Sequence, residues 1–342
     1  MPTPNPLKST GPASFVSEKT FHIAGILTTV YGLQEVTTSC TSISCLWLLH
    51  PRLQTKEMMR YIASRCIQEW NQQAGSNRTI GLIAVAFDQR NHGSREVNAL
   101  ANESWKDGNE THAQDMFSIF NGTAMDTSLL IDHLPSYIFN TKDSPLIEQH
   151  LVLGISLGGH SAWQVLLSDS RVTAGVVIIG CPDYMRVMTD RARLSKLQTY
   201  TSTQGADFHG SKDFPLALMS SLKKWDPKGI IFGTSEIEDT PTLAMQELYT
   251  PILDQKIKGK RILVCSGAND RLVPYHCSKP FMQFLKNATS GWYKGGNVYV
   301  EDNVYPGVGH AFSDGMVKDT IRFVNDTLVA KSGGGVSDLS KI

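Results

Sequence analysis

The sequence has no excess of charge of one sign, no long apolar run and none of the common metal-binding motifs. Lys and Arg together number 32 in 342 residues, and so do Asp and Glu, so the net charge is zero. We therefore expect no nucleic-acid partner, and a small neutral or apolar substrate is favoured. No stretch approaches the roughly 20 apolar residues of a membrane-spanning helix, so we expect no membrane span. With no CxxC or HExxH motif and 10 scattered histidines, the sequence predicts no metal and no cofactor.

A signal peptide is also lacking, and cysteine is sparse. The opening MPTPNPLKSTGPAS is rich in proline and has no apolar core, so we expect a protein that is not secreted. Of the 6 cysteines, Cys45, Cys181 and Cys265 lie in or beside apolar runs. Free buried thiols are therefore favoured over a disulfide framework.

Strand-like and helix-like segments alternate along most of the chain, which indicates an α/β fold with a mostly parallel sheet covered on both faces. Short apolar runs typical of buried strands occupy residues 42–50, 79–88, 150–156, 172–180 and 261–267. Met58, Ile62, Cys66 and Trp70 stand four residues apart, which predicts a helix with one apolar face. Further helices are expected over 112–138, 276–288 and 311–330. The polar stretch 89–111 predicts a loop at the carboxyl edge of the sheet.

One short motif suggests a nucleophile. Gly154-Ile155-Ser156-Leu157-Gly158 matches the pattern G-x-S-x-G, with the strand LVLGIS before it and the helix HSAWQVLL after it. The chemistry needs these glycines because the serine sits in a strained strand-to-helix turn, where a side chain would collide with neighbouring backbone. We predict Ser156 as the nucleophile. The alternative is a glycine-rich turn with an incidental serine.

A serine nucleophile requires a general base and a carboxylate that orients the base. Asp270 follows the strand RILVCSG, and His310 lies in a glycine-flanked loop after the last strand, so both should reach the carboxyl edge of the sheet. We predict His310 as the base and Asp270 as the orienting acid. A helix-capping aspartate and a surface histidine are the alternatives. The rival bases fit less well, because His112 precedes the serine and His160 lies in the helix behind it.

Acyl transfer places negative charge on the carbonyl oxygen, which two main-chain N–H groups can stabilise. Leu157, the residue after the nucleophile, is the first predicted donor. The second should come from the loop after the strand at 42–50. Because Pro51 has no N–H, we assign Arg52 as the second donor, with Leu53 as the fallback.

These features together resemble the α/β-hydrolase superfamily over residues 20–330. His50-Pro51 stands where the superfamily usually has His-Gly, and the segment Asp88-Gln89-Arg90-Asn91-His92-Gly93 resembles its D-x-R-G-H-G turn. The resemblance implies an eight-stranded, mostly parallel sheet with helices on both faces, formed by residues 1–181 and 261–332. It further implies a helical lid at 182–260 and leaves a flexible tail at 333–342.

A narrower resemblance rests on Trp105, Asn109, His112, Met116 and the segment Cys181-Pro182-Asp183-Tyr184, which look like a group of fungal α/β-hydrolases. Packing of loops and lid is an equal alternative for these residues. The ending Ser340-Lys341-Ile342 is similar to the S-K-L peroxisomal address. Together these features resemble the peroxisomal α/β-hydrolases of Alternaria host-selective toxin clusters, which make an epoxy-decatrienoic acid. The resemblance implies a peroxisomal import receptor as partner and a role in fungal secondary metabolism, with the cytoplasm as the alternative location.

The motifs predict a serine hydrolase that cleaves an ester or acyl thioester through an acyl-enzyme. An acyltransferase would use the same three residues, and a non-catalytic binding protein would use only the scaffold. Phe214, Leu218 and Leu222 in the predicted lid would suit an acyl chain, although packing within the lid explains them better.

Overall fold

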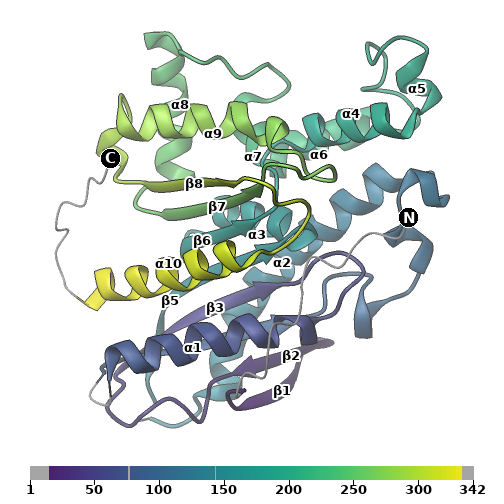
Figure 1. Cartoon of the computed structure of the whole chain (residues 1–342). Helices are drawn as coiled ribbons and strands as arrows, with labels where there is room; N and C mark the ends of the chain where they lie inside the picture. Colours follow the sequence, from purple (N-terminus) through teal and green to yellow (C-terminus); the bar gives the residue numbers. More distant parts are fainter. Residues whose placement is uncertain (1–14, 76–77, 143, 333–342) are drawn as a thin grey trace.

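The computed structural model describes residues 15–75, 78–142 and 144–332 (Figure 1). The predicted tail at 333–342, with its tripeptide Ser340-Lys341-Ile342, lies outside the described residues.

An eight-stranded sheet runs through the molecule in the order β1-β2-β4-β3-β5-β6-β7-β8. β1 pairs antiparallel with β2, and β2 pairs antiparallel with β4, whereas the other neighbours are parallel. The strands are β1 (Glu18–Ile23), β2 (Ile26–Tyr31), β3 (Ser42–Leu49), β4 (Ile80–Phe87), β5 (Leu146–Ile155), β6 (Val172–Ile178), β7 (Arg261–Gly267) and β8 (Tyr299–Tyr305). The predicted α/β architecture with a mostly parallel, eight-stranded sheet is thus confirmed.

The central strands are apolar throughout because both faces of the sheet are covered. All eight residues of β3 are buried. Trp47 and Leu49 point into the core on one face of the sheet, while Leu46 and Leu48 point into the core on the other. This alternation follows from the two-residue period of a strand.

Helices cover the two faces unequally. α1 and α10 pack on one face, in front of the sheet in Figure 1, whereas α2, α3, α7, α8 and α9 contribute to the core on the other face. The α-helices are α1 (Arg60–Ala74), α2 (His112–Ile138), α3 (Leu157–Ser168), α4 (Tyr184–Ser195), α5 (Gln198–Thr201), α6 (Leu216–Trp225), α7 (Pro227–Phe232), α8 (Leu243–Lys256), α9 (Tyr275–Ser290) and α10 (Asp314–Ser332). Within the described part of the chain, no helix has the length and apolarity needed to cross a membrane.

The predicted apolar face of the helix α1 is present with one change. Ile62, Cys66 and Trp70 are buried against the sheet, but Met59 takes the buried place expected for Met58. Met58 lies in a short 3-10 helix, η1 (Lys56–Met59), that precedes α1 and has a different period.

The polar stretch 89–111 is a connection, as predicted, but it contains short helical turns. These are η2 (Gly93–Arg95), η3 (Ala99–Asn102) and η4 (Trp105–Asp107), and a fifth 3-10 helix, η5 (Lys294–Gly296), precedes β8. All 6 cysteines are buried and free of disulfide bonds.

The segment between β6 and β7 is helical and divides into two parts. α7 and α8 place Ile231, Phe232 and Leu253 in the core on the face of the sheet that α2 and α3 cover. α4 and α6 instead pack in a separate apolar cluster with the N-terminal half of α2 and with Leu157, beside the predicted nucleophile. Figure 1 shows α4, α5 and α6 together at the upper right.

Candidate active site

Ser156 occupies the turn between β5 and α3, with φ 56° and ψ −113°. This positive φ is rare for a residue with a side chain and is a form of backbone strain found at functional sites. The Ser156 N–H donates to Ile178 O on β6 (2.9 Å), and its carbonyl accepts the first bond of α3 from the His160 N–H (3.1 Å). The turn is therefore held from both the sheet and the helix.

The glycines around Ser156 are required by contacts that leave no room for a Cβ atom. A Cβ at Gly154 would lie 1.9 Å from the carbonyl oxygen of Gly158. A Cβ at Gly158 would lie 2.0 Å from the carbonyl oxygen of Leu49, at the end of β3. Both distances are far below van der Waals contact, so the sequence pattern G-x-S-x-G reflects close backbone packing around the serine.

The structure brings the three predicted residues together in one hydrogen-bonded chain. Ser156 Oγ lies 2.9 Å from His310 Nε2, and His310 Nδ1 lies 2.8 Å from Asp270 Oδ2. The side chains of Asp270 and His310 are 0% and 5% exposed, so this chain is shielded from water. The histidines His112 and His160 make their hydrogen bonds elsewhere.

Two loops must meet to place Asp270 beside His310, and their backbones are bonded to each other. The Ala268 N–H donates to Tyr305 O (3.0 Å), and the Asn269 N–H donates to Val308 O (2.9 Å). Gly267 permits this approach, because a Cβ there would lie 2.4 Å from Gly309 O.

The carboxylate of Asp270 is oriented by its own loop. Its Oδ1 accepts from the main-chain N–H groups of Leu272 (2.8 Å) and Val273 (3.0 Å). Oδ2 therefore remains for His310. Asp270 thus stabilises its turn and orients the histidine at the same time.

The loop after β3, which carries the predicted donor Arg52, is fixed by His50. The Gln89 N–H donates to His50 Nε2 (2.9 Å), so Nδ1 carries the proton and donates to Pro51 O (2.8 Å). Burial lowers the pKa of His50 to about 4, which keeps the ring neutral. Leu53 has a positive φ of 60°, so the loop turns sharply just after Arg52.

The turn after β4 shows how Asn91 replaces the glycine of the superfamily pattern. Asn91 has φ 58°, a conformation that asparagine tolerates better than most residues. Its Oδ1 accepts from the N–H groups of Val97 and Asn98, both at 2.9 Å. The side chain therefore organises the following loop as well as forming the turn.

The pocket around Ser156 is almost closed, with a volume of about 20 Å³. This volume corresponds to roughly one water molecule. The pocket is lined by Arg52, Met116, Ser156, Leu157, Arg191, Leu272, Val273 and His310. An acyl substrate can enter this pocket only after side chains or helices around it move.

Arg191 on α4, like Leu272 and Val273, lines the pocket without having been predicted from the sequence. It lies in the segment RARLS, where a basic residue on a polar helix gives no signal of a role. Its position beside Ser156 depends on α4 packing over α2, which no local pattern encodes. Phe214 and Leu222, by contrast, are buried in the cluster formed by α2, α4 and α6 and do not line this pocket.

The residues that carry the narrower resemblance mostly join α2 to α4. The Tyr184 hydroxyl donates to Ala113 O (2.7 Å), and the ring of Trp105 lies 5.1 Å from that of His112. Met116 lines the pocket around Ser156. Packing of loops and helices therefore accounts for most of this group.

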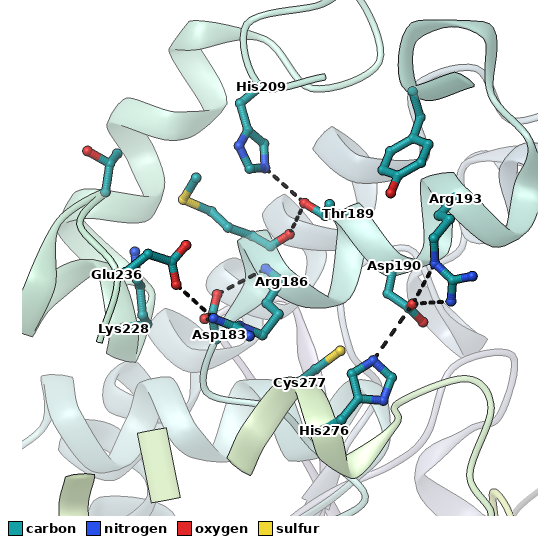
Figure 2. A pocket seen from close by; sticks show the side chains of 13 residues that line it. Asp183, Arg186, Thr189, Asp190, Arg193, His209, Lys228, Glu236, His276 and Cys277 are labelled. Atoms are coloured by element: carbon teal, nitrogen blue, oxygen red, sulfur yellow. Dashed lines mark hydrogen bonds and ion pairs between the residues drawn. The ribbon is translucent and has the colours of Figure 1, made fainter. Parts of the chain in front are cut away.

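A larger cavity of about 390 Å³ lies between α4, the start of α9 and residues 200–236 (Figure 2). Several of its charged side chains are paired with one another, as the dashed lines in Figure 2 show. Arg193 bonds to Asp190 (2.6 Å), and Arg186 bonds to Glu236 (2.8 Å). Asp190, His276 and Cys277 come close enough to share a cation, but Arg193 already occupies the carboxylate.

No protein-family model and no curated protein sequence matches the chain. Solved structures do match. The chain is similar to the Thermus thermophilus protein TT1662, with a TM-score of 0.56 and 16% identity over 92% of this chain and 98% of that one. It is also similar to the acylaminoacyl peptidase of Pyrococcus horikoshii, with a TM-score of 0.51 and 12% identity, over 96% of this chain and 44% of the peptidase.

The chain has the α/β-hydrolase fold. At these identities the comparisons show the fold alone. Within the α/β-hydrolase fold, Ser156 occupies the turn between β5 and α3, while Asp270 and His310 follow β7 and β8. All three therefore lie at the carboxyl edge of the parallel strands, where open α/β sheets bind ligands.

Proposed function

We propose that the protein is a serine hydrolase that cleaves an ester or acyl thioester, with Ser156 as nucleophile, His310 as general base and Asp270 as the orienting carboxylate. The observation that carries the proposal is the hydrogen-bonded chain from Ser156 Oγ through His310 to Asp270, built on a strained serine turn. A packed scaffold without chemistry would not require this strain.

The geometry supports a two-step mechanism. Ser156 Oγ attacks the carbonyl carbon while its proton passes to His310 Nε2. The tetrahedral intermediate then collapses, and His310 returns the proton to the leaving alcohol or thiol. Water next attacks the acyl-enzyme, with His310 again taking the proton, and releases the acid. Asp270 holds Nδ1 protonated throughout, so Nε2 stays available as the acceptor.

The main-chain N–H of Leu157 is the proposed first oxyanion donor, because it opens α3 and has no acceptor within the helix. The N–H of Arg52 is the proposed second donor, with Leu53 as the alternative, since this loop borders the same pocket. Two such donors stabilise the charge that develops in the transition state.

The proposed lid is smaller than the segment 182–260. α4 and α6 pack in one apolar cluster with Leu157, and α4 also lines the pocket of Ser156, whereas α7 and α8 belong to the core on the face of the sheet that α2 and α3 cover. We assign the lid to residues 184–225, which must shift to admit a substrate to the 20 Å³ pocket.

A fluorophosphonate probe tests the mechanism, because it reacts covalently with an activated serine. We expect wild-type protein to be labelled and Ser156→Ala to remain unlabelled. Ser118→Ala, which removes an exposed hydroxyl on α2, is the matched control and should label normally. Unlabelled wild type, or equal labelling of Ser156→Ala, contradicts the mechanism.

We further propose peroxisomal import through Ser340-Lys341-Ile342 and a role in the synthesis of a fatty-acid-derived fungal metabolite. The support is the tripeptide and the narrower sequence resemblance. A fluorescent fusion that keeps this C-terminus free should be punctate, and deletion of the tripeptide should make it diffuse. A diffuse full-length fusion contradicts the import proposal. Metabolite profiles with and without the gene test the pathway.

A further inference from the structure

Two guanidinium groups border the pocket that contains Ser156 and His310. Arg52 comes from the loop after β3, and Arg191 comes from α4. Both side chains are partly buried, and the residues that line the pocket include no carboxylate. Two cations therefore line the pocket beside Ser156, although the whole chain is neutral, and the Asp270 carboxylate lies behind His310.

Within the described part of the chain, the guanidinium of Arg191 donates only to uncharged acceptors. Its guanidinium donates to His112 Nε2 (2.9 Å), Met116 Sδ (3.1 Å) and Leu272 O (3.0 Å). His112 can accept because its other nitrogen, Nδ1, donates to Glu103 O (2.7 Å). A thioether sulfur is a weak acceptor, so these contacts position the cation without neutralising it.

The two arginines also act on each other. Burial, followed by repulsion from Arg191, lowers the pKa of Arg52 to about 10, although Glu103 and Asp107 oppose this shift. Burial lowers the pKa of Arg191 as well, while Asp270 acts in the opposite direction. An anion between the two guanidiniums would offset both the repulsion and the lost hydration.

In the larger cavity of Figure 2, by contrast, arginine side chains are paired with carboxylates. There, Arg193 is bonded to Asp190 at 2.6 Å and Arg186 to Glu236 at 2.8 Å. Arg191 is only two residues from Arg193 on α4, yet it faces the nucleophile pocket and has no carboxylate on its guanidinium among the described residues.

We propose that Arg191 and Arg52 form an anion subsite that selects substrates with a carboxylate close to the scissile carbonyl. The inference rests on the proposed hydrolase function and names its substrate class. Because both arginines line the same small pocket as Ser156, the anion must lie within a few bonds of the reacting carbon. The phosphates of a coenzyme A thioester lie many bonds from its acyl carbon and do not meet this requirement.

Matched substrates test the preference. Mono-4-nitrophenyl glutarate carries the carboxylate on the acyl side, and its methyl ester is the neutral counterpart. 4-Butanoyloxybenzoate and its methyl ester place the same difference on the leaving-group side. We expect kcat/KM to favour one anionic member over its neutral partner by about 10- to 100-fold, as a charge-assisted hydrogen bond allows. The pair that shows the difference identifies the side that carries the carboxylate.

Variants assign the preference to the arginines. Arg191→Gln should reduce the ratio of kcat/KM for the anionic over the neutral substrate to less than about threefold, mainly through a higher KM for the anionic substrate. Arg52→Gln should also reduce the preference for the anionic substrate, because it removes the guanidinium. The main-chain N–H of residue 52 is kept in this variant. Arg193→Gln, on the same helix but facing the other cavity, is the matched control and should keep the wild-type preference.

Equal kcat/KM for the anionic and neutral members of both pairs in wild type overturns the subsite. An unchanged preference in Arg191→Gln also overturns it. Failure of the hydrolase mechanism looks different, because neither member of either pair would then be cleaved and fluorophosphonate would not react. In that event, calorimetric binding of glutarate to Ser156→Ala decides the subsite independently. No binding, or equal binding by the Ser156→Ala/Arg191→Gln double variant, refutes it.

Discussion

The backbone at Ser156 keeps its positive φ because close contacts on both sides leave no relaxed alternative. Gly154 approaches Gly158, and Gly158 approaches the end of β3 at Leu49. A residue with a side chain at either glycine would push α3 away from the sheet. The backbone geometry of Ser156 thus depends on glycine at positions 154 and 158, where no Cβ atom can be accommodated.

Gly158→Ala tests this contact. The added methyl would lie 2.0 Å from Leu49 O, so we expect a loss of at least about 1–3 kcal/mol in the free energy of unfolding. Denaturant unfolding measures it. Gly295→Ala is the matched control, because a Cβ there has nothing within 4 Å. Equal stability of the two variants would show that the contact is unimportant.

Asp270→Asn tests the orienting role of the carboxylate. Asparagine can keep Oδ1 as acceptor for Leu272 and Val273 but turns an amide toward His310 Nδ1, which favours the wrong tautomer of the ring. We expect kcat to fall about 1,000- to 10,000-fold, with KM little changed. Steady-state kinetics on a 4-nitrophenyl ester measure it. A loss below tenfold, with an unchanged melting temperature, contradicts the assigned role.

At the scale of elements, α4 is the part of the proposed lid that closes over Ser156. It carries Arg191 to the pocket and is joined to α2 by the buried bond from the Tyr184 hydroxyl to Ala113 O. The junction also buries Phe117 and Phe120 against Tyr184. Access to the nucleophile therefore depends on how easily α4 separates from α2.

Tyr184→Phe weakens this junction without changing its apolar packing. Losing one buried hydrogen bond costs about 1 kcal/mol, so amide exchange in residues 184–195 should accelerate about fivefold. Fluorophosphonate labelling of Ser156 should become faster for the same reason. Tyr200→Phe is the control, since the Tyr200 hydroxyl has no hydrogen bond within the described residues. Unchanged exchange and labelling would exclude α4 opening as the route of access.

At the scale of the whole molecule, burial in and around the sheet keeps several histidines in the neutral form. Burial lowers the pKa values of His50, His150 and His160 to about 4. His150, on β5, is further committed as an acceptor by the indole N–H of Trp47 at 3.1 Å. Protonation of any of these rings therefore opposes folding.

The stability of the protein should consequently fall under mildly acidic conditions. Between about pH 6.5 and pH 4 these three rings bind more protons in the unfolded chain than in the folded one, so their contribution lowers the free energy of unfolding as pH falls through this window. The carboxyl of Asp226, whose pKa burial raises, contributes in the opposite direction. Each histidine contributes at most about 1.4 kcal/mol per pH unit. Urea unfolding of wild type across this window should show the decrease.

His150→Gln should flatten that decrease, because it removes one of the titrating groups. His133→Gln changes an exposed histidine and should leave the slope at the wild-type value. A dependence of stability on pH in His150→Gln equal to that of wild type would contradict the neutral state of the buried His150 ring.

The sequence by itself determined the main strands and helices, and it also determined that the candidate site residues lie at the carboxyl edge of the sheet. Continuous apolar runs require strands covered on both faces, and the G-x-S-x-G turn requires a serine between a strand and a helix. Asp270 and His310 could be selected because they follow strands of the same parallel sheet, whose carboxyl ends share one edge. Each of these inferences uses only a local period or the order of segments along the chain.

Only the tertiary structure decided what surrounds the nucleophile. Arg191 reaches the pocket through the packing of α4 on α2, which are about 75 residues apart in the sequence. No repeating sequence pattern predicts a contact between such distant segments. The division of the 182–260 segment between two apolar clusters, on which the proposed lid rests, depends equally on long-range packing. The net charge favours a neutral substrate, and a sum over the chain cannot show that Arg52 and Arg191 line the same pocket, on which the proposed anion subsite rests.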